Sequence, residues 1–177
     1  SRRMGLGGRR ANATEIPYGM LTDAEIMRLP IGGLADDAAH LYLWSTRRRF
    51  REGVAAAVAR AWGFEPVGEI IWGLRNPGMG TPSIANDHEP VLIAARGGLP
   101  FTAEAPMGVH FWRQRYVYGP SRVPEKEHSA KPDAFLDCVE AWSPGPYVEL
   151  FARRARFGWD YWGDESLETA TMPEAAA

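Results

Sequence analysis

Cysteine is nearly absent from the 177 residues, and Cys138 is the single example. One thiol cannot form an intramolecular disulfide or a cysteine-rich zinc site, so the fold must be stabilised by packing. Long apolar stretches are also missing. No run of about eighteen apolar residues occurs, and the N-terminus carries arginine and glycine where a secretory signal would be apolar. These absences disfavour membrane-spanning and secreted proteins, so we expect a cytoplasmic protein.

The familiar catalytic signatures are absent as well. The sequence contains no Walker loop and no G-x-S-x-G motif. Gly78-Met79-Gly80 begins like a dinucleotide-binding fingerprint, but Pro82 and the lack of a following amphipathic helix remove that interpretation. The histidines lack the spacing of metal ligands, so we expect no metal site. Motif spacing alone therefore indicates no specific chemistry.

Apolar and aromatic residues are plentiful, and the charge is unevenly distributed. Hydrophobic residues make up 45% and aromatic residues 11%, which is typical of one folded domain. The net charge is −2, yet residues 1–159 hold 20 basic against 17 acidic residues. Of the basic residues 18 are arginine, and they cluster, for example in Arg47–Arg51. Clustered guanidinium groups suit phosphate contacts, although a compositional bias spread over solvated surfaces would produce the same pattern.

Hydrophobic periodicity predicts alternating helices and strands. The predicted helices are Asp23–Leu29, which starts at the capping-box spacing Thr22-x-x-Glu25, Arg47–Trp62 and Pro132–Trp142. The predicted strands are His40–Trp44, Val67–Leu74, Pro90–Ala95 and Tyr147–Phe151, with a further extended segment around 111–118. The Gly/Pro/Asn-rich segment 75–87 is predicted to be a long irregular loop that faces a substrate.

This alternation predicts an α/β three-layer sandwich with a largely parallel sheet. Ligands in such folds bind beyond the carboxyl ends of the strands, so the segments after Trp44, Leu74 and Phe151 are expected near the site. We expect a mobile N-terminal arm over residues 1–15, one domain over 16–165 and a disordered tail over 166–177.

A series of sequence blocks resembles a known family. The blocks are Ile16-Pro17-Tyr18-Gly19-Met20, Leu41-Tyr42-Leu43-Trp44, Ile70-Ile71-Trp72, Asn86-Asp87-His88-Glu89, His128-Ser129-Ala130-Lys131-Pro132-Asp133 and Ser143-Pro144-Gly145-Pro146-Tyr147-Val148-Glu149-Leu150-Phe151. They resemble, in the same order, the N6-adenine methyltransferase family named for the seventy-kilodalton subunit of the mRNA adenosine methyltransferase. The similarity is greatest to short bacterial and phage members.

The resemblance implies a Rossmann-like methyltransferase fold that binds S-adenosylmethionine and methylates the exocyclic amine of adenine in nucleic acid. The family accepts hydrogens of that amine with an Asp-Pro-Pro-Trp motif at the end of a strand, and these 177 residues contain no such motif. We expect the motif just upstream of Ser1. The alternatives are a noncatalytic subunit that binds nucleic acid or a catalytic partner, and a plain adenosine-binding domain.

The resemblance also assigns roles to individual positions. Cofactor-binding roles fall on Lys131, Phe151, Arg153 and Asp164, and substrate-binding roles fall on Tyr18, Glu89 and Trp44. Asp164 stands where the family usually has asparagine; an aspartate can accept hydrogen bonds from both ribose hydroxyls but cannot donate one. Glu89 opens an apolar strand, where an unpaired carboxylate would be costly, so a partner is expected for it.

The expected partner is nucleic acid. DNA is favoured over RNA because the chain is compact and shows no RNA-binding appendage. A homodimer, or a heterodimer with a related subunit, is compatible with the resemblance, and no membrane partner is expected. Cys138 is expected in the core of its helix, without a nucleophilic role.

Overall fold

The structure is a computed structural model that describes residues 21–81, 84–102, 131, 133–152 and 155–162. In chain order the elements are α1 (Asp23–Met27), α2 (Ile31–Leu34), β1 (Ala39–Trp44), α3 (Arg47–Arg51), α4 (Val54–Ala61), β2 (Glu65–Thr81), β3 (Ile84–Arg96), α5 (Asp133–Trp142), β4 (Tyr147–Leu150) and β5 (Trp159–Trp162). The expected N-terminal arm, the extended segment around 111–118 and the expected tail lie outside the described residues.

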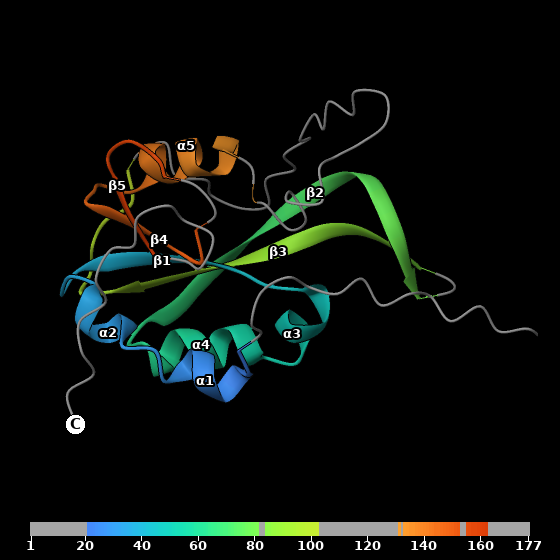
Figure 1. The fold of residues 1–177 in the computed structure, drawn as a ribbon, viewed down its shortest axis with the longest axis horizontal. Helices are drawn as coiled ribbons and strands as arrows, with labels where there is room; N and C mark the ends of the chain where they lie inside the picture. The colour runs from blue at the N-terminus through green and yellow to red at the C-terminus, as the bar shows by residue number, and fades with distance from the viewer. Residues whose placement is uncertain (1–20, 82–83, 103–130, 132, 153–154, 163–177) are drawn as a thin grey trace, which may run out of the picture.

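A three-stranded sheet forms the middle layer (Figure 1). Its order is β1-β3-β2, and β3 pairs antiparallel with both neighbours. Helix α5 covers one face of this sheet, and helices α1 to α4 lie on the other (Figure 1). Strands β4 and β5 form a separate parallel pair. Helices on both sides of a sheet confirm the expected layers.

The prediction of a largely parallel sheet is wrong for the described three-stranded sheet. β1 and β2 run in the same direction, as two strands joined through helices should. However, β3 lies between them, and only two residues separate Thr81 at the end of β2 from its partner Ile84. So short a connection can only join antiparallel strands, because a parallel pair needs a crossover of a dozen residues or more.

The same hairpin corrects the prediction of an irregular loop over 75–87. The backbone of this segment continues β2 and β3, with Gly78 opposite Asn86 and register shifts after Gly73 and Gly78. Glycine permits such bulges without breaking the ladder, so a glycine-rich stretch need not be a loop. In Figure 1 the ribbon extends past the part of the sheet that the helices cover.

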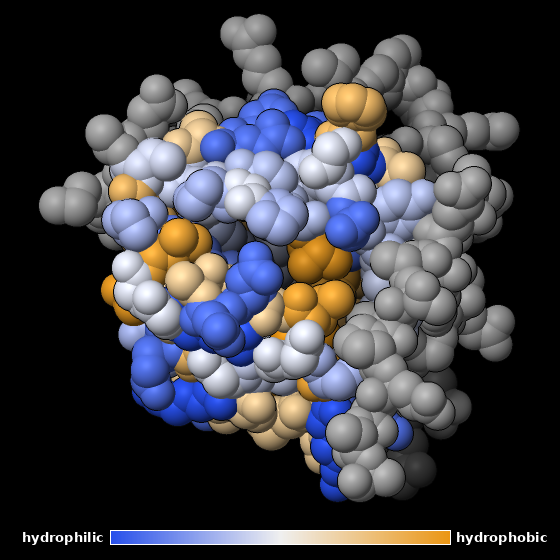
Figure 2. Space-filling model, turned by 90° about the vertical axis from the view of Figure 1, so that its left-hand side faces the viewer, coloured by the Kyte–Doolittle hydropathy of each residue, from blue (hydrophilic) through white to orange (hydrophobic). Residues whose placement is uncertain are grey.

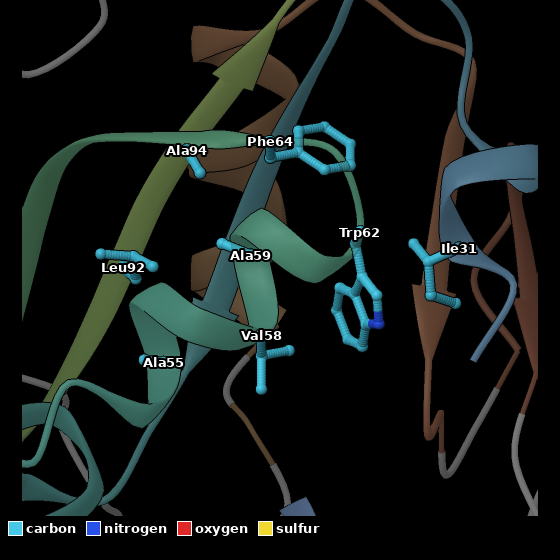
Figure 3. Close-up of a cluster of buried hydrophobic side chains, with 8 residues drawn as sticks. All are labelled: Ile31, Ala55, Val58, Ala59, Trp62, Phe64, Leu92 and Ala94. Carbon is cyan, nitrogen blue, oxygen red and sulfur yellow. The ribbon is translucent and has the colours of Figure 1, made fainter. Parts of the chain in front are cut away.

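Helix α4 packs on one face of the sheet (Figure 3). Its buried residues Ala55, Val58 and Ala59 belong to the same cluster as Leu92 and Ala94 of β3. The predicted continuous helix over 47–62 is wrong, because Gly53 adopts φ 76° and divides it into α3 and α4. A left-handed residue cannot lie inside an α-helix, and glycine adopts this conformation at little cost.

Helix α5 packs on the opposite face. Its bounds are close to the prediction, and its apolar side carries Phe135, Leu136, Val139 and Trp142 into the cluster formed with the sheet. Cys138 is buried in this cluster, and burial raises the pKa of its thiol to about 11. The expected core position of Cys138 is confirmed. A thiol with a raised pKa is a poor nucleophile.

The capping box predicted from Thr22 and Glu25 is confirmed at the start of α1. The backbone amide of Glu25 donates to Thr22 Oγ1 at 3.3 Å, and the amide of Thr22 donates to Glu25 Oε2 at 2.7 Å. The Thr22 hydroxyl also donates to Glu25 Oε2 at 2.7 Å, and this bond, together with the bond from the Thr22 amide, lowers the pKa of the Glu25 carboxyl. The box fixes where this short helix begins.

The face of the molecule at the α2 end is mixed in polarity. Figure 2 shows hydrophilic side chains over most of this face, with hydrophobic ones gathered near its middle. The large hydrophobic residues that are exposed among the described ones are Leu21, Val67, Val148, Phe151 and Phe157. Within the described part of the chain, no helix is long and apolar enough to cross a membrane.

A buried polar group joins β1 to the end of α5. Ser143 is buried, and its Oγ lies 2.7 Å from His40 Nδ1 and 2.8 Å from the hydroxyl of Tyr42. His40 Nε2 lies 2.9 Å from the carbonyl oxygen of Leu99, which can only accept, so Nε2 carries a proton. Burial raises the pKa of Tyr42 to about 12, which keeps the phenol neutral.

We predict that Ser143→Ala destabilises the protein by about 1–3 kcal/mol, because it leaves the partly buried Tyr42 hydroxyl and His40 Nδ1 without their shared partner. Urea unfolding followed by circular dichroism measures this loss. Ser45→Ala is the matched control, since its hydroxyl is engaged at the surface. Equal free energies of unfolding for the two variants would contradict the role of Ser143 as the shared partner of Tyr42 and His40.

Candidate functional site

The candidate site lies where β1 ends and the helix-covered part of β3 begins. Trp44 is the last residue of β1 and pairs with Val91, while Glu89 pairs with Trp72 of β2. Side chains alternate between the two faces of a strand, so Glu89 and Val91 point to the same face. That face is the one covered by α5. Two residues assigned to substrate from the sequence, Trp44 and Glu89, are therefore neighbours.

Lys131 joins these two residues just before α5. Its Nζ lies 2.5 Å from Glu89 Oε2 and 4.6 Å from the centre of the Trp44 ring. The side chains of Lys131 and Glu89 are 30% and 34% exposed. The partner expected for Glu89 is therefore Lys131. An ammonium between a carboxylate and an indole face gains from both the ion pair and the cation–π contact.

The Trp44 ring is held by two further aromatic rings. It lies 4.8 Å from Phe135 and 5.7 Å from Trp72, centre to centre, in edge-on arrangements. Phe135 and Trp72 are almost fully buried and contact each other at 5.9 Å. Edge-to-face contacts at these distances restrict the orientation of each ring. Lys131 therefore lies over a ring that is fixed by the core.

Phe135 and Trp72 were not identified as site residues from the sequence. Phe135 follows Lys131 by four residues, a spacing that could have suggested that they lie together. The position of Trp72 depends on its register with Glu89, which only the paired strands reveal. We name Lys131, Glu89 and Trp44 together the ion-pair group, and Trp72 and Phe135 its aromatic support.

The ion-pair group is suited to binding polar ligands. The Glu89 carboxylate accepts hydrogen bonds, and the Lys131 ammonium has three donors that can hold an anion. Partial exposure leaves both charges within reach of a ligand. Among the described residues, no three histidine, cysteine or acidic side chains gather where they could hold a metal ion.

Phe151, assigned to the cofactor from the sequence, lies directly after β4 in the second sheet. Its backbone has φ 60°, and it is the one described residue other than glycine with a positive φ. Its ring is 48% exposed and contacts Trp162 edge-on at 5.4 Å. A bulky residue in this conformation is uncommon, and such strain concentrates at functional sites.

The second sheet is attached to the C-terminal half of α5. Glu140 Oε1 accepts from Arg156 Nε at 2.9 Å and from Trp159 Nε1 at 2.6 Å, and Arg156 also pairs with Asp137 at 2.6 Å. Both carboxylates raise the pKa of Arg156. Tyr147 stacks on Trp159 at 4.8 Å. Helix α5 therefore positions Lys131 at its beginning and the strand before Phe151 near its end.

The three remaining predicted site residues, Tyr18, Arg153 and Asp164, lie outside the described residues. The structure thus brings together Lys131, Glu89 and Trp44. It places Phe151 at a different sheet, connected to the first through α5.

Comparison with known proteins identifies the family. The MT-A70 family profile matches residues 7–165. The chain belongs to the MT-A70 family. This membership confirms the family resemblance of the sequence blocks, and it makes the chain a relative of methyltransferases.

Individual relatives match the chain over different lengths. The type II methyltransferase M.MunI of Mycoplasma is 28% identical over 92% of this chain and 67% of its own length. The human N(6)-adenosine-methyltransferase catalytic subunit METTL3 is 33% identical over 78% of this chain. The N6-methyladenosine RNA methyltransferase MTA1 of Pyricularia oryzae is 35% identical over 60%. The chain spans only 23% of METTL3 and 27% of MTA1.

We predict a measurable energetic coupling between Glu89 and Lys131. A double-mutant cycle of Glu89→Gln and Lys131→Met in urea unfolding should give about 1 kcal/mol, because both charges are two-thirds shielded from solvent. The control cycle is Arg48→Gln with Glu52→Gln, an i,i+4 pair whose arginine is 80% exposed. It should give a smaller coupling, because solvent screens an exposed pair. A coupling no larger than the control would contradict the geometry.

Proposed function

We propose that this protein is an S-adenosylmethionine-dependent methyltransferase that modifies the N6 amine of adenine in nucleic acid. One observation carries the proposal. Lys131 matches a cofactor position of the family and Glu89 a substrate position, and these side chains form one ion pair beside Trp44. A methyltransferase must hold its two ligands in contact, and the ion-pair group is where the two assignments meet.

The residues present fit the cofactor. S-adenosylmethionine carries a carboxylate, which requires a cation, and an adenine ring, which requires a flat apolar surface. The Lys131 side chain is partly exposed beside Glu89 and Trp44, and Phe151, which follows β4, is half-exposed. When bound, the cofactor supplies an electrophilic methyl group. We propose that Lys131, Phe151, Arg153 and Asp164 bind it.

The chain's own side chains would prepare the acceptor. The adenine amine is conjugated with the purine ring and is a poor nucleophile, so its N–H groups need hydrogen-bond acceptors. Glu89 supplies a carboxylate, which we propose accepts a hydrogen bond from this amine while Lys131 orients it. Trp44 holds the ammonium in place, and Tyr18 is proposed to contact the extruded base.

The Asp-Pro-Pro-Trp motif of the family is absent from the 177 residues, and we propose that it precedes them. This absence also supports a second candidate function, a noncatalytic subunit that binds nucleic acid or a catalytic partner. The complete open reading frame distinguishes the two. An upstream motif supports the enzyme, and a reading frame without it supports the subunit.

We propose DNA over RNA as the substrate. The chain covers two-thirds of the type II methyltransferase but about a quarter of MTA1, which is named for RNA. A homodimer or a heterodimer with a related subunit is proposed as the assembled state, in the cytoplasm of a bacterial or phage-infected cell.

We predict that the protein binds S-adenosylmethionine in the micromolar range, about −8 kcal/mol. Lys131→Met should weaken binding by about 1–3 kcal/mol, because a charge-assisted hydrogen bond to the carboxylate is lost. Asp164→Ala should weaken it by a similar amount through the ribose. Isothermal calorimetry measures both, with Arg60→Gln as a surface control. No heat at millimolar ligand would contradict the cofactor assignment.

We predict that incubation of the full-length protein with methyl-labelled cofactor and adenine-containing oligonucleotides places the label at adenine N6. Cys138→Ala and chelators should leave this transfer intact, since no step uses a thiol or a metal. Parallel DNA and RNA substrates decide the preference. Label at cytosine would overturn the proposed reaction, and no label under varied substrates and partners would favour the noncatalytic subunit.

A further inference from the structure

Helix α3 presents an unusual concentration of positive charge. Arg47, Arg48, Arg49 and Arg51, which we call the arginine patch, occupy four of its five positions. The fifth, Phe50, packs against the core cluster beneath the sheet. Arg48, Arg49 and Arg51 are exposed, and Arg47 is partly buried. Burial of Phe50 thus fixes the helix while the guanidinium groups surround its outer surface.

The arginine patch is close to the ion-pair group in the chain and in space. Only Ser45 and Thr46 separate Trp44 from α3, and the Ser45 amide donates to the carbonyl of Pro90 at 3.0 Å. Three residues span at most about 10 Å between Cα atoms. The patch therefore begins within about 10 Å of the residue that supports Lys131, at the same end of β1 (Figure 1).

Two described carboxylates lie beside the exposed arginines of the patch. Glu52 pairs with Arg48 at 2.7 Å, and Asp23 pairs with Arg49 at 2.9 Å. Glu52 also lies 3.6 Å from Arg49, so one carboxylate is shared by two arginines. The Arg48–Glu52 pair is highly exposed, and such pairs contribute little to stability. A ligand anion can displace them at small cost.

The helix favours these charges only in part. Arg48, Arg49 and Arg51 lie in the last turn of α3, where the helix dipole favours cations. Arg47 and Arg51 are four residues apart, where like charges repel each other. A bound polyanion would relieve this repulsion.

We propose that the arginine patch binds the phosphodiester backbone of the nucleic-acid substrate beside the target adenine. The inference rests on the proposed function, which places the adenine at the ion-pair group. Guanidinium groups match phosphate oxygens with paired hydrogen bonds, and several of them on one short helix suit a polyanion. The patch positions the strand and reads no sequence.

The test compares the intact parent protein with Arg48→Gln/Arg51→Gln, since glutamine preserves helix propensity. Arg60→Gln is the matched control, because Arg60 is an exposed arginine on α4 with one weak ion pair. Fluorescence anisotropy with an adenine-containing 20-base-pair DNA duplex is recorded at several salt concentrations. Calorimetry with S-adenosylmethionine and unfolding curves are recorded on the same proteins.

The double variant should bind the duplex roughly three- to tenfold more weakly at low salt, and its salt slope should fall by about 1 for each phosphate contact removed. Its KM for duplex should rise with kcat unchanged, and its cofactor binding and stability should match the parent. Arg60→Gln should bind like the parent.

Two results overturn the proposal: a double variant with the parent's affinity and salt slope, or a parent that binds no duplex. If the double variant keeps the parent's affinity and salt slope and the parent transfers methyl groups, phosphate binding by the arginine patch is refuted. The proposed function then still stands. A parent whose duplex binding depends on the patch but which transfers no methyl group refutes the enzyme and supports the patch. A double variant that loses only binding to an acidic protein partner also overturns it.

Discussion

Strand β3 must be apolar on both faces, and the rest of the structure depends on this constraint. It is the central strand, paired on both edges, with helices above and below. Val91 is completely buried toward α5, while Leu92 and Ala94 are buried toward α4. Each side chain removed from water contributes about 25 cal/mol per Å² of apolar area. A polar residue in this stretch would leave a charge or a hydrogen-bonding group between two packed layers.

The first charge on the N-terminal side of that stretch is Glu89, and the site is built around it. At the end of the covered sheet, a carboxylate is only partly solvated, so it needs a partner. Lys131 supplies the charge from the segment before α5, and Trp44 supplies a ring face whose orientation the buried aromatic rings determine. Helix α5 also binds residues of the second sheet through Glu140. One helix therefore positions both the ion-pair group and the strand before Phe151. The described candidate residues at the two sheets thus share α5 as a support.

Local rules predicted the local elements well. The capping box of Thr22 and Glu25, the apolar side of α5 and the compact β1 are each specified by residues a few positions apart. The sequence-based predictions were wrong where glycine is compatible with two different backbone structures. Glycines in 75–87 suggested a loop, yet they form bulges in a paired ribbon. Gly53 followed a helical pattern, yet its left-handed backbone divides the helix, and Phe50 and Val54 on either side of it both pack against the core.

By itself the sequence determined the family, the alternation of helices and strands, and the residue types assigned to the site. These follow from blocks and periodicities that short-range chemistry controls. The tertiary structure alone decided the antiparallel order β1-β3-β2, because strand order depends on which pairings bury both faces of β3. It alone placed Lys131 against Glu89, 42 residues away in the chain, and set Trp72 and Phe135 behind Trp44. Contacts of this separation arise from the packing of whole layers, and no local pattern encodes them.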